Sequence, residues 1–484
     1  MQQTGSRMKD QIRRFERLAR TLDPDPQARA GMTRHAVSFS DDFLASLPGR
    51  GTYRRGSHKP DPGAFGLQDG PASMGEALAI FEQDVLGSGI NPASGSAFGY
   101  IPGGGIYPSA LADYLADVTN QYSGVSFASP GGAQLERSLL RWMATELVGL
   151  PETAGGDLTS GGSIANLSAI VTAREACGIR ARDVERSVVY LTAQTHHCVD
   201  KALRVAGLGE CVVRRVSMDA GWRMSPRALI EQVSLDRADG LRPWMVVASA
   251  GTTHVGAVDP LDAIADIAAE HGLWNHVDAA YGGFFLLTEH GRQRLAGIER
   301  ADTVVLDPHK GLFLPFGTGT VLARDERQLA AAHRHTANYM QDAHADDGAF
   351  SPADLGPELS RPFRGLRLWL PLKLFGLEPF RAALEEKLLL ARYFRQQLLQ
   401  MPGFEVGPEP DLSVVTYRFI PEHGDADECN QRLLQAVHTD GHSFISSTRL
   451  DDQFVLRLAC LHMRSHLQQV DELLALLARE SEKL

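Results

Sequence analysis

The fold of this chain is decided by the stretch Val304-Val305-Leu306-Asp307-Pro308-His309-Lys310-Gly311. Its apolar start is typical of a buried strand in a parallel sheet, and Pro308 ends that strand. Lys310 then lies at the mouth of the strand, where partial desolvation favours the neutral amine. A neutral lysine amine can form a Schiff base with an aldehyde. A solvent-facing loop lysine is the usual alternative, so the prediction needs a second element.

A second strand end lies about 30 residues upstream, in Trp274-Asn275-His276-Val277-Asp278-Ala279-Ala280-Tyr281-Gly282-Gly283. The carboxyl ends of parallel strands are where open α/β sheets bind ligands. We therefore expect Asp278 and Lys310 to flank one flat ligand. Pyridoxal phosphate needs both groups, because its aldehyde takes a lysine and its ring nitrogen needs an anion. The alternative for Asp278 is a helix cap or a turn residue.

A third segment suits a phosphate group. Residues 158–167 begin with a Thr, Ser and Gly cluster and continue into a helical pattern rich in Ala and Leu. Such a helix start offers free backbone N–H groups to a dianion. The segment is neither a Walker loop nor a dinucleotide fingerprint. A simple helix cap is the alternative.

Together these segments resemble the group II pyridoxal-phosphate-dependent amino acid decarboxylases, which include aromatic-L-amino-acid, glutamate and histidine decarboxylases. The resemblance runs in family order over residues 75–480, and its combination of motifs is specific. The motifs are 100–102 (Tyr-Ile-Pro), 129–130 (Ser-Pro), 159–167, 195–196 (Thr-His), 251–253 (Gly-Thr-Thr), 276–281 (His-Val-Asp-Ala-Ala-Tyr), 307–310 (Asp-Pro-His-Lys) and Arg361. The resemblance implies an α/β protein of pyridoxal-phosphate fold type I with a mostly parallel central sheet.

The resemblance also implies roles for residues around the cofactor ring. Lys310 would carry the cofactor, and Asp278 would pair with the pyridine nitrogen. Ala280 would lie against one face of the ring, while His196 would stack on the other and later move a proton. A metal site around His196 is not expected, because adjacent side chains diverge and no second ligand pair has zinc-like spacing.

Further cofactor contacts follow from the same resemblance. Gly162 and Ser163 would hold the phosphate, with His309 nearby. Thr253 would donate a hydrogen bond to the Asp278 carboxylate and fix its orientation. An ordinary turn is the alternative for Thr253.

Three positions bear on the substrate. Tyr339 lies in a polar stretch that resembles the mobile catalytic loop of the family, where a tyrosine reaches the partner subunit's site and protonates the carbanion. Arg361 would meet or shape the site of the substrate carboxylate, with a solvated salt bridge as the alternative. Tyr100 opens the entrance segment to the substrate pocket. Glycines at 103–105 permit a wider pocket, although they also fit a flexible loop.

The chain divides into three predicted regions: an N-terminal helical dimerisation segment at 1–105, a cofactor-binding domain at 106–385 and a small α/β domain at 386–484. Met8, Ile12, Phe15, Leu18 and Leu22 have helical spacing, and an isolated amphipathic helix must bury its stripe. Strands of the middle region are predicted at 188–192, 211–216, 244–248, 274–277, 303–306 and 320–323, and those of the last region at 414–419 and 454–458. The helical stretches between the strands imply right-handed crossovers and a mostly parallel sheet.

Composition is that of a soluble globular protein of two or three domains, with 484 residues and 43% hydrophobic content. A net charge of −11 without a basic run argues against nucleic acid as a partner. The five cysteines are scattered and odd in number, which suits a reducing cytoplasm. The sequence has neither a long apolar segment nor a signal-peptide core, so no membrane association is expected.

The resemblance implies decarboxylation of an L-amino acid, with an aromatic substrate favoured over an acidic one, by a homodimer that shares its active sites. Oxidative deamination or transamination on the same fold is the first alternative, and Tyr339 together with His196 argues against it. A non-catalytic cofactor-binding protein is the second alternative, and the intact set of Lys310, Asp278, His196 and Tyr339 argues against that.

Overall fold

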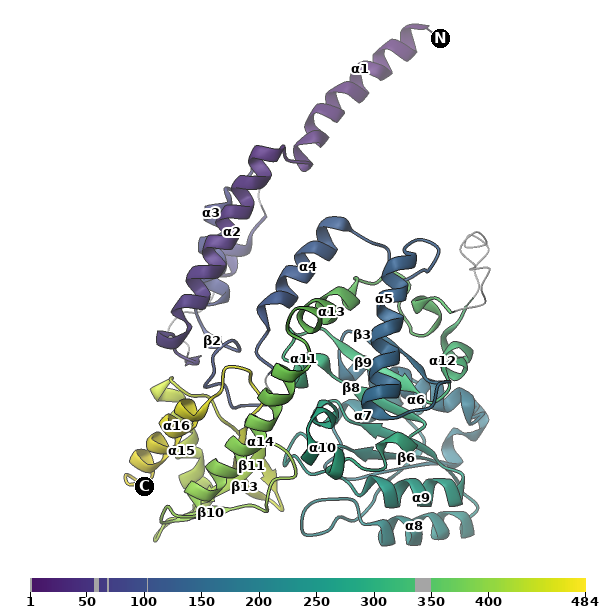
Figure 1. Cartoon of the computed structure of the whole chain (residues 1–484), viewed down its shortest axis with the longest axis vertical. Coiled ribbons are helices and arrows are strands. Elements are labelled where there is room, and N and C mark those ends of the chain that lie inside the picture. The colour runs from purple at the N-terminus through teal and green to yellow at the C-terminus, as the bar shows by residue number, and fades with distance from the viewer. Residues whose placement is uncertain (1, 56–60, 68, 102, 336–349) are drawn as a thin grey trace. The chain divides into compact units, whose positions relative to one another are not determined.

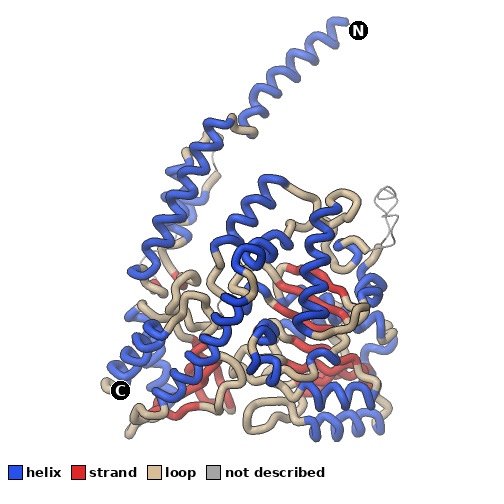
Figure 2. Tube along the Cα trace, in the orientation of Figure 1, coloured by secondary structure: helices blue, strands red, loops and turns tan. Residues whose placement is uncertain are grey.

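The computed structural model describes residues 2–55, 61–67, 69–101, 103–335 and 350–484. The chain forms two compact units, Met1–Ser94 and Gly95–Leu484. Figure 1 labels their helices and strands, and Figure 2 separates helix from strand by colour. The predicted boundaries at residues 105 and 385 stay predictions.

The larger unit is built on a seven-stranded sheet in the order β3-β9-β8-β7-β6-β4-β5. The strands are β3 Gly155–Thr159, β4 Ser187–Leu191, β5 Val212–Arg215, β6 Arg242–Ser249, β7 Trp274–Asp278, β8 Thr303–Leu306 and β9 Gly319–Ala323. From β5 to β8 all neighbours pair in parallel, whereas β9 runs antiparallel to both β8 and β3. The mostly parallel sheet and its six expected strands are confirmed.

Sequence reasoning missed β3, the edge strand that leads into the predicted phosphate segment. Its two glycines give it the appearance of a turn. The structure requires them, because a Cβ added at Gly156 would lie 2.3 Å from the carbonyl oxygen of Val321 on β9. The antiparallel pairing of β3 with β9 therefore depends on close backbone approach, which a propensity-based prediction penalises.

Helices cover both faces of this sheet (Figures 1 and 2). Side chains alternate along each strand, so Val188 and Tyr190 of β4 pack in one apolar cluster and Val189 and Leu191 in another. The first cluster includes residues of α5 (Pro130–Arg141), α8 (Pro226–Ala238) and α9 (Leu261–His271), and the second includes residues of α6 (Gly162–Ala176) and α7 (Cys198–Val205). Burial on both faces explains the uninterrupted apolar character of the strands.

A second sheet of the same unit is antiparallel, in the order β10-β11-β13-β12. Its strands are β10 Phe404–Val406, β11 Val414–Phe419, β12 Ser446–Leu450 and β13 Gln453–Ala459. Helices α14 (Glu378–Leu398), α15 (Ala426–Asp440) and α16 (Leu467–Ser481) share its apolar core. The runs expected at 414–419 and 454–458 are therefore confirmed as strands, and β10 and β12 are additions.

The smaller unit is largely helical, with α1 (Gln2–Ala19), α2 (Pro26–Ser46) and α3 (Met74–Ile80), and a two-stranded pair of β1 (Tyr53–Arg54) with β2 (Gly89–Ile90). The helix expected near residues 8–22 is present as α1, and the long α2 was not predicted. Its start is marked by Asp25, whose carboxylate accepts the N–H of Ala28 at 2.9 Å. The apolar stripe of α1 is exposed, as Phe15 illustrates at 63%.

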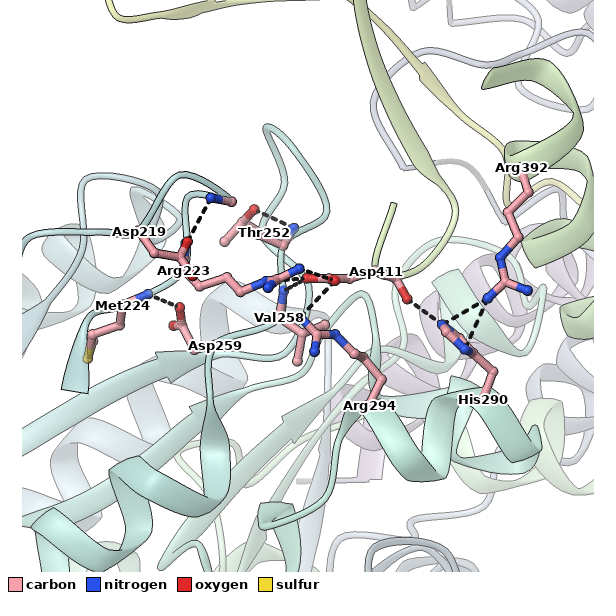
Figure 3. Close-up of polar contacts among 12 residues, drawn as sticks. Asp219, Arg223, Met224, Thr252, Val258, Asp259, His290, Arg294, Arg392 and Asp411 are labelled. Carbon is pink, nitrogen blue, oxygen red and sulfur yellow. Dashed lines mark hydrogen bonds and ion pairs between the residues drawn. The ribbon is translucent and has the colours of Figure 1, made fainter. Parts of the chain in front are cut away.

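Asp411, between β10 and β11, ties the two sheets of the larger unit together (Figure 3). Its carboxylate pairs with Arg223 and Arg294, each at 2.7 Å, and accepts the backbone N–H of Val258 at 2.8 Å. Its carbonyl oxygen accepts from Nε2 of His290 at 2.8 Å. Arg392 of α14 can only donate, so it donates to Nδ1 of the same imidazole, at 3.0 Å.

We expect Asp411→Asn to lower the free energy of unfolding by about 2–3 kcal/mol, because it leaves two guanidinium groups without their carboxylate. Partial exposure of both arginines keeps the loss below that of a fully buried pair. Chemical denaturation measures the change. Glu231→Gln, which breaks the exposed pair of Glu231 with Arg227, is the control and should cost less than about 1 kcal/mol. Equal effects of the two changes would contradict the central role of Asp411.

Candidate active site

A cavity of about 350 Å³ opens at the carboxyl ends of the parallel strands. Loops after β4, β6, β7 and β8 and the start of α6 form its walls. This is the position at which open α/β sheets bind ligands. The structure brings together in it all eight residues predicted to contact the cofactor, which are Gly162, Ser163, His196, Thr253, Asp278, Ala280, His309 and Lys310.

Lys310 is held by an ion pair. It lies on the short helix α11 (Pro308–Gly311), and its Nζ is 3.0 Å from the carboxylate of Asp307. Burial alone would lower the pKa of Lys310, but the nearby charges of Asp307 and Asp278 outweigh it and the pKa is raised. The expectation that desolvation makes this amine neutral is therefore wrong for the cofactor-free protein. Asp307, one residue before Pro308, was not recognised as a partner.

Asp278 ends β7 and points its carboxylate into the cavity. One oxygen accepts the backbone N–H of Ala280 at 3.1 Å, and the other accepts from the side-chain amide of Asn166 at 3.3 Å. Thr253 lines the cavity but makes no hydrogen bond to this carboxylate among the described residues. The structure gives Asn166 as the side chain that orients this carboxylate, and the role of Thr253 stays a prediction. The four-residue spacing from Gly162 places Asn166 on the helix face that meets Asp278.

His196 follows β4 and lines the same cavity. Its Nδ1 faces the backbone N–H of Cys198 at 3.3 Å, and because that group can only donate, the ring proton lies on Nε2. Burial lowers the pKa of His196, partly opposed by the charge of Asp278. The imidazole is therefore neutral near pH 7. Its ring centroid is 4.1 Å from that of His197, so the two imidazoles are in contact.

The start of α6 forms the other end of the cavity. First-turn N–H groups of a helix have no acceptor within it, and the helix dipole adds partial positive charge there. Ser160, Ser163 and the ring of His309 line the same end, and Nδ1 of His309 donates to the carbonyl of Thr318 at 2.6 Å. These groups fit a phosphate dianion. Together with the Asp278 carboxylate and the Lys310 amine, these groups fit pyridoxal phosphate.

The two residues expected to bind substrate lie outside the lining of this cavity. Arg361 is buried, where its guanidinium pairs with Asp157 and with Glu136 at 3.1 Å and donates to the carbonyl of Leu158 at 2.8 Å. Its charge is already neutralised by these buried partners, and its role in meeting or shaping the substrate site stays a prediction. Tyr100 is 63% exposed and packs against Phe444 at a ring distance of 5.9 Å.

Two of the three glycines of the entrance segment, Gly103 and Gly104, serve close packing, whereas a Cβ added at Gly105 would meet no atom within 4 Å. A Cβ added at Gly103 would lie 2.2 Å from the carbonyl oxygen of His309, and one at Gly104 would lie 2.6 Å from the ring of His462. Gly104 also has a φ of +106°, which side-chain-bearing residues rarely adopt. Small residues here let the segment pack against the backbone beside Lys310. The wider pocket stays a prediction.

Tyr339, the predicted proton donor, lies outside the described residues. Within the described ranges, no group of three or more His, Cys, Asp or Glu side chains is arranged to hold a metal ion. The helices of the same ranges include none that is both long and apolar enough to cross a membrane.

Comparison with known proteins agrees with this geometry. The family described as "Pyridoxal-dependent decarboxylase conserved domain" matches residues 76–420. An aromatic-L-amino-acid decarboxylase of Bacillus atrophaeus is 36% identical over 376 residues, which is 77% of this chain and 78% of that protein. A phenylacetaldehyde synthase of Arabidopsis thaliana is 31% identical, over 81% of this chain and 82% of its own length.

Among solved structures, the TDC of Oryza sativa with PLP and tryptamine superposes with a TM-score of 0.89 at 26% identity. The match covers 95% of this chain and 99% of that one. The resemblance and the fold class expected from the sequence are thereby confirmed. The chain therefore belongs to the pyridoxal-phosphate-dependent amino acid decarboxylases, which are carboxy-lyases, and its cofactor is pyridoxal phosphate.

Proposed function

We propose that this enzyme converts an aromatic L-amino acid to its amine and carbon dioxide. The observation that carries the proposal is the convergence of Lys310, Asp278 and His196 on one cavity. The aromatic preference is supported by the Bacillus relative and by the tryptamine in the rice structure. An acidic amino acid is the alternative substrate.

Each residue then has a task that its position supports. When bound, pyridoxal phosphate supplies an aldehyde for attachment and a ring that accepts the electrons released with carbon dioxide. Lys310 is the attachment point. Asp278 would hold a proton on the ring nitrogen, and His196 and Ala280, which line the same cavity, would contact the ring. The first turn of α6 holds the phosphate with His309.

The return of a proton to the substrate's α-carbon distinguishes simple decarboxylation from the oxidative alternative. His196 is neutral with its proton on Nε2, so it can hold or deliver a proton at that atom. Tyr339 is proposed as the donor that restores the proton at the substrate's α-carbon. A phenylacetaldehyde synthase among the relatives keeps the oxidative outcome as the second candidate. The presence of both Tyr339 and His196 favours the simple amine product.

We propose a homodimer in the cytoplasm as the working form. Helix α4 (Tyr107–Thr119) carries an exposed apolar stripe at helical spacing, made of Tyr107, Leu111, Tyr114, Leu115 and Val118. An exposed stripe of this kind marks a contact surface, and a second copy of the chain is its proposed partner. All five cysteines are unpaired, as a reducing compartment would keep them.

An amino acid panel with purified enzyme and added cofactor tests the reaction. We expect amine and carbon dioxide in equal amounts from an aromatic substrate, measured by mass spectrometry. Lys310→Ala should abolish both products and the covalent attachment of cofactor that borohydride traps. Lys373→Ala, which removes an exposed lysine away from the cavity, should leave both intact.

Other products would redirect the assignment. Aldehyde with ammonia would place the enzyme with the oxidative relatives and refute the roles of Tyr339 and His196. Amine formation from acidic substrates alone would refute the aromatic preference. Activity retained by Lys310→Ala would refute the attachment point itself.

The ion pair of Lys310 with Asp307 predicts a pH effect. Lys310 must lose a proton before its amine can attach an aldehyde, and Asp307 raises the pKa of that amine. In Asp307→Asn the pKa falls, so cofactor should attach about tenfold faster at pH 7 and the pH midpoint of the attachment rate should move down. Stopped-flow absorbance measures this rate. Asp325→Asn, away from the cavity, is the control, and an unchanged midpoint in Asp307→Asn would disprove the coupling.

The dimer proposal is tested on α4. Leu111→Lys combined with Leu115→Lys places two charges on the apolar stripe and should shift sedimentation from dimer to monomer. Leu235→Lys, on the exposed face of α8, should leave the dimer unchanged. A wild-type chain that sediments as a monomer would refute the proposal.

A further inference from the structure

A chain of buried hydrogen bonds runs beneath the cavity and ends on Asp278. Trp274, His276 and Asp278 alternate along β7, so their side chains share one face of the sheet. His276 is fully buried and pairs in register with Thr303 of the neighbouring strand β8. Asn166 of α6 bridges from His276 to Asp278.

Each link in this chain is a short contact between named atoms. Trp274 Nε1 lies 3.0 Å from Thr303 Oγ1, and Thr303 Oγ1 lies 2.9 Å from His276 Nδ1. His276 Nε2 lies 2.8 Å from Asn166 Oδ1. Nδ2 of the same asparagine donates to the Asp278 carboxylate at 3.3 Å and to the carbonyl of Gly162 at 2.9 Å.

The two ends of the chain fix the direction of every hydrogen bond between them. The indole of Trp274 can only donate, so Thr303 accepts from it, but the hydroxyl oxygen has a second lone pair and this end alone leaves the contact with Nδ1 of His276 without a direction. The asparagine end gives that direction: the imidazole proton lies on Nε2 and donates to Asn166, so Nδ1 accepts the hydroxyl proton of Thr303.

The orientation of the asparagine is itself fixed by the acceptors that its amide faces. The carboxylate of Asp278 and the carbonyl of Gly162 can only accept, so the amide of Asn166 must present its NH₂ group to them and its oxygen to His276. The reversed amide would place an oxygen against both acceptors. Burial lowers the pKa of His276 to about 4, so the ring is neutral and has a single proton to donate.

We propose that Asn166, held by His276 and Thr303, is a positioning residue that keeps Asp278 ionised and aimed at the cofactor's ring nitrogen. The proposal rests on the role assigned to Asp278 under the proposed function. Outside this chain of hydrogen bonds, the titratable groups that interact electrostatically with Asp278 are Lys310, His196 and Cys198, and all three line the cavity. Asn166, His276 and Thr303 approach from the core side, where all three are fully buried.

The side-chain amide of Asn166 also links the two ends of the cavity. Gly162 opens α6, where the phosphate is proposed to bind, and its carbonyl is held by the amide that holds Asp278. Asn166 therefore connects the phosphate end of the cavity to the acid at its other end. Loss of this residue should disturb both cofactor affinity and protonation of the ring nitrogen.

The test uses the full-length enzyme loaded with pyridoxal phosphate labelled with ¹⁵N in the ring. The ¹⁵N chemical shift reports the proton on the ring nitrogen directly, and fluorescence titration gives cofactor affinity. In Asn166→Ala we expect affinity to fall about tenfold, as for a lost hydrogen bond to a charged group. The ring nitrogen should lose its proton at a lower pH than in the wild type.

Thr303→Val and Thr303→Ser form a matched pair of variants at a residue that reaches Asn166 only through His276. Valine keeps the shape and removes the hydroxyl, so the protonation midpoint should move in the same direction as in Asn166→Ala. Serine keeps the hydroxyl and should match the wild type. This pair decides the question even where Asn166→Ala fails to fold.

The outcomes separate this inference from the function on which it rests. Wild-type shifts and affinities in Asn166→Ala and Thr303→Val would overturn the positioning role. A wild-type enzyme whose bound ring nitrogen carries no proton, or that binds no cofactor, would instead overturn the role of Asp278. Equal losses in Thr303→Val and Thr303→Ser would also overturn the inference, because they would show that packing rather than the hydroxyl matters.

Discussion

Parallel pairing of β7 with β8 is the constraint on which the rest of the site depends. It sets Asp278 beside Val305, so that the chain leaving β8 turns at Pro308 and returns Lys310 to the same edge of the sheet. The neighbouring strands β4 and β6 deliver His196 and Thr253 to that edge as well. The order of strands therefore determines which chemical groups meet, because parallel strands present all their carboxyl ends together.

Charge placement follows from burial at this edge. Two carboxylates, Asp278 and Asp307, face one lysine in a confined space, and a buried charge is tolerated only when it is paired or hydrogen-bonded. Asp307 takes Lys310 as its partner. Asp278 instead receives N–H donors from Ala280 and Asn166, which leaves its charge free to act on a ligand. The two acids thus have separate tasks despite similar surroundings.

Support for these groups comes from elements outside the cavity. The cluster around Arg361 locks β3 beneath the phosphate end through Asp157 and Glu136. Buried Arg457 of β13 donates to the carbonyl of Thr253 at 2.6 Å, so the small sheet holds a wall of the cavity. Asp411 fixes the same loop further along, at Val258. The placement of the side chains that line the cavity therefore depends on the whole larger unit rather than on one motif.

The sequence by itself determined the parallel strands and the identity of the main chemical groups. Strand residues such as Val304 carry apolar periodicity, and Asp278 and Lys310 stand in motifs whose residue types answer the needs of one cofactor. Such signals lie within short stretches of the chain, so they can be recognised from the sequence alone. The partners Asp307 and Asn166, and the buried ion pairs of Arg361, were decided only by the tertiary structure. Hydrogen bonds and ion pairs of buried groups depend on distances between elements remote in sequence, such as the 112 residues that separate Asn166 from Asp278, and no local pattern encodes those distances.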